Sequence, residues 1–345
     1  MPTREEVVEA VQRCGSKRGA ARELGVDPNT IKWHLGMAER WGARETLQDL
    51  NPIPEGIPVE SLIDRRIGDY SARAAIVKAQ SFRRIGVKID GPIGILHMGD
   101  PHVDDDGTDI ELLFRHTELT RKTEGLYAAN IGDMTNNWIG RLVRLYAEQG
   151  TSAKQGREIA EYFLKSADWL YLVGGNHDYW TGGTGVLDWY AKQAGLYQSG
   201  QFHYHGVRMG LEFYNGFQCR INSRHDFRGT SEMNNVYGGQ KEAKMAFHDH
   251  IMVCGHRHIS GYGTVSNPAP ETGDGEVGII SHCIRVGSYK KIDSFAREKG
   301  LPYQNFSPAI MTIINPSAVR ESAKIHVALD PEDGAEYLTW LRNRK

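Results

Sequence analysis

The chain has 345 residues, a formal net charge of -2 and 40% hydrophobic residues. This length allows one large domain and a smaller one, and the near-neutral charge excludes a polycation that binds nucleic acid through its overall charge. Cys14, Cys219, Cys254 and Cys283 form no CxxC pair, which predicts free thiols in a reducing compartment. No apolar run reaches the ~18 residues of a membrane span, and the acidic first residues do not resemble a signal peptide. We therefore expect a cytoplasmic protein that has no membrane partner.

Residues 1–45 are predicted to form a small helical domain. Apolar residues at helical spacing predict helices over 3–13, 17–24 and 30–40, and the turn 25–29 separates the last two. Two helices joined by a short glycine-containing turn are typical of a helix-turn-helix.

The segment 19–26 (GAARELGV) resembles the second helix and the turn of bacterial and phage helix-turn-helix domains. The resemblance implies that the following helix enters a major groove of DNA, and paired half-sites would suit a homodimer. The alternative is a helical cap or an oligomerisation module without nucleic acid. Tryptophan is unusual on the helix face that reads DNA, so the alternative is that Trp33 is buried in the core of the helical domain. The residues expected to contact DNA are Lys17, Arg18, Arg22, Asn29, Thr30, Lys32, Trp33 and His34.

Residues 46–90 are predicted to be a linker followed by a basic helical arm. Three prolines within 49–58 are typical of a linker. A helix is expected from Val59 to about Arg84, with several arginines and lysines along it. One interpretation is that this helix lies along a phosphate backbone. The alternative is that its charged residues only form a face in contact with solvent.

From Gly91 onwards strands and helices alternate, which predicts an α/β domain over 91–345 with a two-layered β core between helices. The predicted strands are 93–98, 126–131, 169–173, 202–206, 211–214, 217–221, 251–254, 278–285, 309–314 and 324–329. The predicted helices are 108–124, 139–166, 184–194 and 331–342.

Aspartate, asparagine or histidine follows five of the predicted strands or the turns after them. These endings contain the letters DPH, GD, GNHD, HD and GHRH. Sites gather at the carboxyl ends of strands in open α/β sheets, so we expect these side chains to converge on a metal site.

In order and local form, the blocks DPH, GDMTN, GNHD, HD and GHRH resemble those of the calcineurin-like metallophosphoesterase superfamily, over about residues 91–330. The resemblance implies a four-layer α/β/β/α sandwich and two divalent cations, with manganese expected first and iron, zinc or magnesium as alternatives. It implies that Asp133 bridges the two cations. It further implies that Asp100, His102 and His258 complete one cation's ligands, and Asn176, His225 and His256 the other's.

The same resemblance implies roles for three further residues. His177 matches the non-ligand histidine that protonates the departing oxygen, while hydroxide generated on the metal pair attacks phosphorus. Asp178, or another carboxylate, is expected to orient that imidazole, and Asn136 to position substrate or hydroxide. The alternative is a degenerate phosphoesterase fold with a structural role.

The motifs leave the substrate open. Fusion to a helix-turn-helix favours a DNA nuclease or phosphodiesterase that is directed to DNA, and the catalytic part looks similar to prokaryotic and phage DNA-repair nucleases of the superfamily. One alternative is a phosphatase or cyclic phosphodiesterase acting on a small substrate; another is a DNA-binding regulator with a sensing phosphoesterase domain. No coiled-coil docking segment is evident, so the sequence does not support an ATPase partner. Four aromatic residues near the blocks are candidates for stacking on bases: Trp138, Tyr179, Trp180 and Tyr262.

Overall fold

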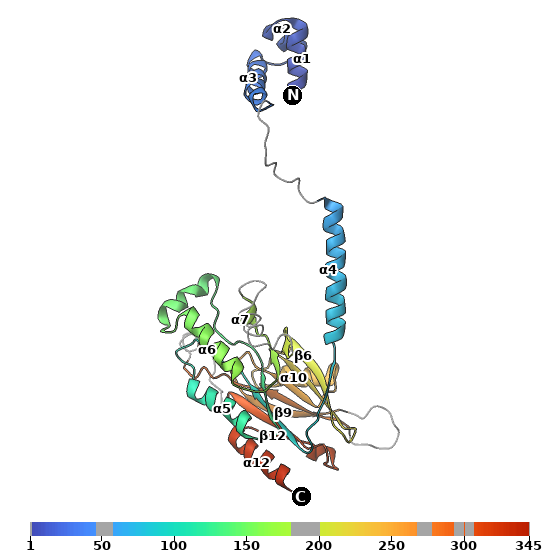
Figure 1. Cartoon of the computed structure of the whole chain (residues 1–345), viewed down its shortest axis with the longest axis vertical. Helices are drawn as coiled ribbons and strands as arrows, with labels where there is room; N and C mark the ends of the chain where they lie inside the picture. The colour runs from blue at the N-terminus through green and yellow to red at the C-terminus, as the bar shows by residue number, and fades with distance from the viewer. Residues whose placement is uncertain are drawn as a thin grey trace. The chain divides into compact units, whose positions relative to one another are not determined.

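The structure is a computed structural model that describes residues 2–45, 58–180, 201–267, 278–292, 300 and 307–344 (Figure 1). The chain divides into two compact units, Met1–Ser71 and Ala72–Lys345. The helix predicted over 184–194 lies outside the described residues.

The first unit begins with three helices: α1 (Arg4–Cys14), α2 (Lys17–Glu23) and α3 (Pro28–Glu45). Thr3 caps α1 through a capping box with Glu6, and Gly15 ends it in the left-handed conformation (φ 65°), which glycine adopts without strain. The two buried alanines of α2 leave room for close helix packing. The helices share a core of Val7, Ala10, Ala20, Ala21 and Ile31.

The helix predicted from Val59 to about Arg84 ends earlier than expected. Helix α4 covers Val59–Gln80, and Arg83 and Arg84 belong to strand β1 (Arg83–Gly86). β1 pairs in parallel with β6 (Gly206–Glu212), and Arg84 forms an ion pair with Glu212. Pairing with a strand distant in the sequence therefore overrides local helix propensity, and these two arginines are not part of a helical arm.

The second unit contains two six-stranded sheets. One has the order β12-β11-β2-β3-β4-β5, with β2, β3, β4 and β5 parallel to one another and β11 antiparallel to both β2 and β12. The other has the order β1-β6-β7-β8-β10-β9. The strands of the first sheet are β2 (Ile93–Met98), β3 (Leu126–Asn130), β4 (Trp169–Val173), β5 (Phe202–His203), β11 (Ala309–Ile314) and β12 (Ile325–Ala328). The remaining strands of the second are β7 (Gln218–Arg224), β8 (Ile251–Cys254), β9 (Gly261–Ser266) and β10 (Ile280–Arg285).

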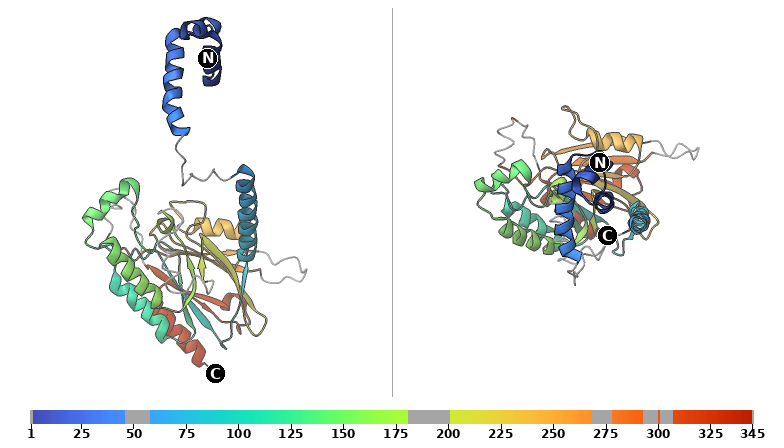
Figure 2. Two further views of the ribbon diagram at one scale, coloured as in Figure 1. Left: turned by 45° about the horizontal axis from the view of Figure 1, so that its top comes forward. Right: turned by 90° about the horizontal axis from the view of Figure 1, so that it is seen from above.

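The predicted α/β/β/α sandwich is confirmed. A buried cluster with Ile95, Tyr171 and Ile221 fills the space between the sheets. A second cluster, with Leu113 and Phe163, lies between the first sheet and three helices (Figure 2, teal, green and red). These helices are α5 (Ile110–Lys122), α6 (Ala153–Lys165) and α12 (Pro331–Asn343). On the other side, α10 (Tyr237–Met245) covers the second sheet.

Several details differ from the sequence-based expectations. The predicted helical region 139–166 is split into the 3-10 helix η1 (Gly140–Glu148) and α6, because the Ser152 capping box begins a new helix. Helix α10 and strand β9 were not predicted; both are short, and β9 is rich in glycine, so their periodic signals are weak. The four cysteines are free, as expected.

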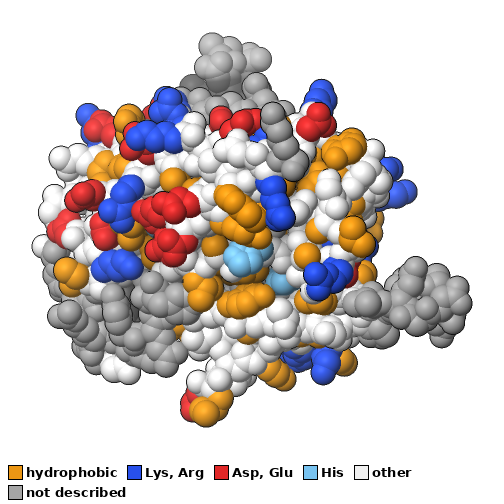
Figure 3. Space-filling view, turned by 90° about the horizontal axis from the view of Figure 1, so that it is seen from below, with side chains coloured by type: hydrophobic (Ala, Val, Ile, Leu, Met, Phe, Trp, Pro, Cys, Tyr) orange, Lys and Arg blue, Asp and Glu red, His pale blue; other side chains and the backbone are white. Residues whose placement is uncertain are grey.

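Charged side chains of both signs are mixed on the face shown in Figure 3. Lysine and arginine side chains are interspersed with acidic ones, and the described part of this face has no continuous basic surface. None of the helices in the described ranges combines the length and apolar character needed to span a bilayer.

Candidate metal centre

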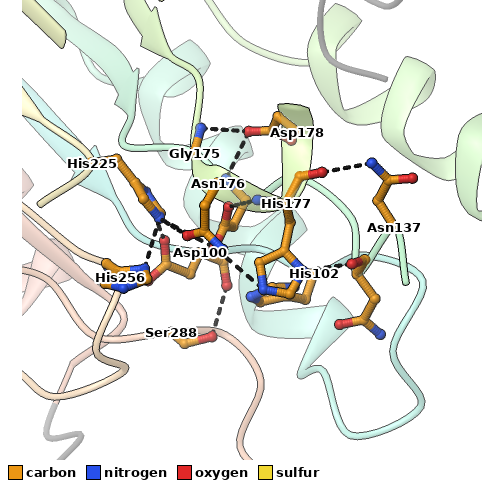
Figure 4. Close-up of polar contacts among 12 residues, drawn as sticks. Asp100, His102, Asn137, Gly175, Asn176, His177, Asp178, His225, His256 and Ser288 are labelled. Atoms are coloured by element: carbon orange, nitrogen blue, oxygen red, sulfur yellow. Dashed lines mark hydrogen bonds and ion pairs between the residues drawn. The ribbon is translucent and has the colours of Figure 1, made fainter. Parts of the chain in front are cut away.

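Both sheets deliver polar side chains to the same place. The parallel strands β2, β3 and β4 end just before Asp100, Asp133 and Asn176. In the other sheet the parallel strands β7 and β8 end just before His225 and His256. Side chains from both sheets converge in Figure 4. The parallel strand ends thus explain why segments far apart in sequence form one cluster.

Backbone conformation marks the same residues. Six non-glycine residues of the described chain have positive φ, and four of them are predicted ligands: His102 (41°), Asp133 (53°), His256 (70°) and His258 (54°). Non-glycine residues seldom adopt such angles, and those that do cluster at functional sites. The tight loops after the strands therefore aim these side chains at the cost of some backbone strain.

One half of the cluster surrounds the Nε2 atom of His225. Asn176 Oδ1 lies 2.9 Å, His256 Nδ1 3.0 Å and Asp133 Oδ2 3.2 Å from this nitrogen. His225 Nδ1 is 2.9 Å from the carbonyl oxygen of Ile131, so the ring proton belongs on Nδ1 in the neutral tautomer. Nε2 then presents a lone pair to oxygen and nitrogen acceptors, an arrangement that a shared cation satisfies.

The other half involves His102, His258 and Asp100. The Nε2 atoms of the two histidines are 3.3 Å apart, and His258 Nε2 is 3.9 Å from Asp100 Oδ2. Asp100 Oδ1 and His102 Nδ1 are buried without a hydrogen-bond partner, although His225 Nδ1 lies 3.7 Å from Asp100 Oδ1. Buried polar atoms without hydrogen bonds are uncommon, and these two fit the surroundings of a bound cation.

The donor set therefore fits two divalent cations. Two groups of side chains offer converging ligand atoms, and Asp133 belongs to both, as expected of a bridging carboxylate. The first group joins it to His102 and His177, the second to His225 and His256. The first group thus contains His177, whereas the sequence-based expectation joined His102 with His258 and Asp100. His102 Nε2 and His258 Nε2 lie 3.3 Å apart, while His177 Nε2 and His258 Nε2 each lie 3.9 Å from a carboxylate oxygen, of Asp133 and Asp100 respectively. Oxygen and nitrogen donors without thiolate suit manganese, iron, zinc or magnesium.

Charge in the cluster is strongly coupled. Burial raises the pKa of Asp100 to about 8. Burial alone would lower the pKa of His225, but the Asp133 carboxylate outweighs it and raises that pKa to about 10. Burial likewise opposes ionisation of Asp133, yet the facing imidazoles hold its pKa below its usual value. Protons and cations therefore compete for the same ligand atoms.

His177 lies beside the cluster and is oriented by the main chain. The His177 Nδ1 atom is 2.5 Å from the carbonyl oxygen of Asn136. The Asn137 side chain donates from Nδ2 to the carbonyl oxygen of His177 at 2.6 Å. Burial lowers the pKa of His177. The ring of Trp180 packs against the imidazole with centroids 3.9 Å apart.

Asp178 does not have the contact expected of it. Its buried carboxylate accepts hydrogen bonds from the main-chain N–H groups of Asp133 (2.9 Å), Met134 (3.1 Å) and Gly175 (2.7 Å). The side chain thus fixes the two loops that carry Asp133 and Asn176, and the Asn136 carbonyl takes the position at the imidazole that we expected for a carboxylate. A main-chain acceptor cannot be read from residue type, which explains the difference.

The Asn136 side chain is turned away from the cluster. Nδ2 donates to Asp105 Oδ2 at 2.8 Å and to Gln149 Oε1 at 3.3 Å, and the main-chain N–H donates to Asp104 Oδ1 at 2.7 Å. Asp105 Oδ2 also lies 3.0 Å from Lys290 Nζ. The sequence analysis did not predict this network; its only signal was the acidic run 104–106, which follows the DPH block after Val103.

Two other missed residues hold the ligand loops. Arg285 is 1% exposed and donates to Asp226 Oδ1 (2.9 Å), Asn235 O (2.7 Å) and the carbonyl of Gly255. Ser288 Oγ donates to the carbonyl oxygen of Asp100 at 2.7 Å. Arg285 therefore joins the loop of His225 to that of His256.

The four candidate stacking residues separate into two pairs. Trp138 and Trp180 both contact the His177 ring, with centroids 5.3 and 3.9 Å away. Tyr179 packs on Tyr204, and Tyr262 stacks on His282. The two tryptophans are thus the ones that adjoin the candidate centre.

The predicted DNA contacts lie in the other compact unit. Trp33 is 62% exposed, so the alternative that it is a core residue is wrong. Lys17, Arg18, Arg22, Asn29, Lys32 and Trp33 are exposed, whereas Thr30 and His34 are half-buried.

No family model and no curated protein matches the chain. A single mutant of Vps29 from Entamoeba histolytica is similar over 68% of this chain and 98% of its own, with 15% identity and a TM-score of 0.35. The calcineurin-like phosphoesterase YfkN from Bacillus subtilis is similar over 73% of this chain and 99% of its own, with 12% identity and a TM-score of 0.31. At such TM-scores these similarities carry no argument about function.

Proposed function

We propose that the chain is a dinuclear metal-dependent phosphoesterase that hydrolyses phosphodiester bonds in DNA, with the N-terminal helices directing it to its substrate. The observation that carries the proposal is the convergence of ligand atoms on Asp133 from both sides. Every residue that the phosphoesterase resemblance assigns as a ligand belongs to this cluster or borders it.

The reaction is hydrolysis of one phosphorus–oxygen bond. Two divalent cations held by Asp133 and the neighbouring histidines would supply an activated water and would neutralise charge on the phosphoryl oxygens. Water adds to phosphorus, the bond to the leaving oxygen breaks, and the leaving oxygen takes a proton. His177 is the proposed donor of that proton. In its imidazolium form it carries one proton on Nδ1, against Asn136 O, and a second on Nε2, which faces the cluster; the second proton goes to the leaving oxygen, and the proton that the attacking water loses restores it.

Two observations support DNA as the substrate. The N-terminal unit has a core of its own and exposes lysine and arginine side chains on α2 and α3, which suit phosphate contacts. Trp138 and Trp180 adjoin His177, where a flat base on the leaving side of the phosphate would stack.

The proposal is tested by manganese-dependent cleavage of single- and double-stranded DNA, with bis-para-nitrophenyl phosphate as a small diester. The full chain is compared with His177→Ala and with a triple Arg18→Ala, Arg22→Ala, Lys32→Ala variant. We expect His177→Ala to lower the rate of DNA cleavage by about 10²–10⁴-fold, the usual contribution of a general acid. The triple variant should lose DNA cleavage and keep turnover of the small diester. Turnover of the small diester with intact DNA would reassign the chain to small substrates, and no turnover of either would contradict hydrolysis.

A further inference from the structure

The His177 imidazole contacts the main chain of Asn136, whose side chain in turn contacts residues from two other loops. Its Nδ1 contacts the main-chain oxygen of Asn136 at 2.5 Å. The Asn136 side chain donates to Asp105 Oδ2 at 2.8 Å, and the same oxygen lies 3.0 Å from Lys290 Nζ. We call Asp105 and Lys290 the Asn136 anchor.

The anchor is unusual in its burial. Lys290 is 8% exposed, and the Asp105 side chain is 15% exposed. Removing a lysine and a carboxylate from water costs several kcal/mol per ion, so such a pair contributes little net stability. The hydrogen bond from Asn136 to the shared oxygen gives the pair a different role, because it ties the charge pair to the residue that touches His177.

Asn136 is fixed at two points, and its carbonyl is aimed by them. The side chain is held by Asp105, and the main-chain N–H is held by Asp104 Oδ1 at 2.7 Å. With both ends restrained, the peptide plane after Asn136 has little freedom to rotate. The carbonyl oxygen therefore stays on Nδ1 of His177, which keeps the proton on Nδ1 and turns Nε2 towards Asp133.

Lys290 reaches this place because its loop is attached to the loop after β2. Lys290 forms an isolated bridge with Thr108, and the main-chain N–H of Lys291 donates to Gly107 O at 2.9 Å. Lys290 Nζ is also 5.6 Å from the centre of the Trp138 ring, which flanks the amine on a second side. The amine is thus confined between Asp105 and Trp138.

We propose that Lys290 and Asp105 are positioning residues for proton transfer by His177, acting through the Asn136 main chain. This inference rests on the proposed function, in which His177 donates a proton to the leaving oxygen. Among the contacts given above, the side chains of the anchor meet the Asn136 side chain, and the anchor reaches the ligand residues only through the main-chain N–H of Asp105, which donates to His102 O at 2.9 Å. A side-chain substitution keeps that main-chain bond, so it should slow mainly the steps that need a correctly aimed imidazole.

Leaving groups of different quality separate this role from a general structural one. A nitrophenyl ester of thymidylate releases a stable anion that needs little protonation, whereas dithymidine monophosphate releases an alkoxide that needs a proton. We expect Lys290→Met and Asp105→Asn to lower kcat on the dinucleotide by about 10-fold, within the range seen for outer partners of active-site groups. The KM values and kcat on the nitrophenyl ester should stay within about 2-fold.

A matched control and a double-mutant cycle sharpen the result. Lys291→Met removes a lysine one residue further along and should leave both rates unchanged. In a His177→Ala background, Lys290→Met should have no further effect on the dinucleotide, because the two residues act through the same group. Equal losses on both esters, or an undiminished Lys290→Met effect without His177, would overturn the positioning role.

The anchor is also tested without turnover, by nitrogen-15 NMR of histidine-labelled full-length protein. The Nδ1 proton of His177 should be visible and protected from exchange in the wild type and in Lys291→Met. In Lys290→Met it should exchange rapidly; if it remains protected, the inference fails whatever the kinetics. If the wild type cleaves neither ester yet shows this NMR change, the proposed function fails while the positioning contact stands.

Discussion

The Nε2 atoms of His102 and His258 lie 3.3 Å apart although 156 positions separate these residues in the chain. Each nitrogen belongs to a residue with positive φ, so two strained loops on different sheets aim their imidazoles at one point. Two neutral nitrogens at this distance share at most one proton. A cation bound by both nitrogens would resolve this contact.

Removal of the shared carboxylate should empty both metal positions. Asp133 belongs to both groups of ligand atoms. We therefore expect Asp133→Asn to lower the affinity for both cations by more than the ~10–100-fold that is typical when a residue that only hydrogen-bonds a ligand is replaced. Metal content per chain, measured by plasma mass spectrometry after dialysis against manganese, should fall from two ions to fewer than one. Asp168→Asn, on an exposed side chain of the same unit, is the control and should retain both. Two ions retained in Asp133→Asn would contradict the assigned bridge.

Asp178 should matter for metal affinity without touching the metal. Its carboxylate accepts three main-chain N–H groups of the ligand loops, and the amide in Asp178→Asn turns one acceptor into a donor. We expect a loss of roughly 1–3 kcal/mol in the free energy of unfolding and a ~10–100-fold weaker manganese affinity. Urea unfolding and metal titration measure the two quantities. Stability loss with unchanged metal affinity would show that the loops keep their geometry without this side chain.

Acid should destabilise the second compact unit, Ala72–Lys345, through its buried histidines. His97 bonds Tyr171 Oη and Thr312 Oγ1 at 2.9 Å each, and burial lowers the pKa of His97 to about 3. The unfolded chain takes up a proton near its pKa of about 6.5, so the free energy of unfolding falls as pH drops from there towards 3. Between neutral pH and pH ~5, protonation of this one residue in the unfolded chain lowers the free energy of unfolding by about 2 kcal/mol.

The measurement is urea unfolding of the wild type and His97→Gln at a series of pH values. The variant should start less stable at neutral pH and lose less stability on acidification, because glutamine does not titrate in this range. Burial lowers the pKa of His116, His203, His250 and His282 to about 4 as well, so the variant keeps part of the slope. Parallel curves for the two proteins would rule out His97 as a contributor.

The N-terminal unit should bind DNA through phosphate contacts. Lys32 is exposed on α3, and loss of one phosphate contact reduces the slope of log affinity against log salt by about 1. Lys32→Ala is therefore expected to weaken binding to all sequences alike and to flatten the salt dependence. Fluorescence anisotropy with the full chain checks this, with Lys165→Ala on α6 as the control. An unchanged slope would remove Lys32 from the interface.

Local patterns in the sequence located most of the framework. Strands β2, β4, β8 and β11 have the predicted bounds, because each is a short apolar run bordered by glycine or polar residues. Weakly periodic elements such as α10 and β9 were missed, and β1 was assigned to a helix because its partner β6 lies far along the chain. Long-range pairing leaves no mark in a local window.

Residue types in order determined the candidate ligands, since Asp, Asn and His directly after buried strands already indicate converging donors. The tertiary structure decided what orients them. The Asn136 carbonyl contacts His177, the Asp178 carboxylate accepts three N–H groups, and Arg285 donates to the carbonyl oxygens of Asn235 and Gly255. Each of these contacts involves main-chain atoms, which every residue type carries alike. Sequence determines which side chains are available for chemistry, and only the folded backbone determines which of them face one another.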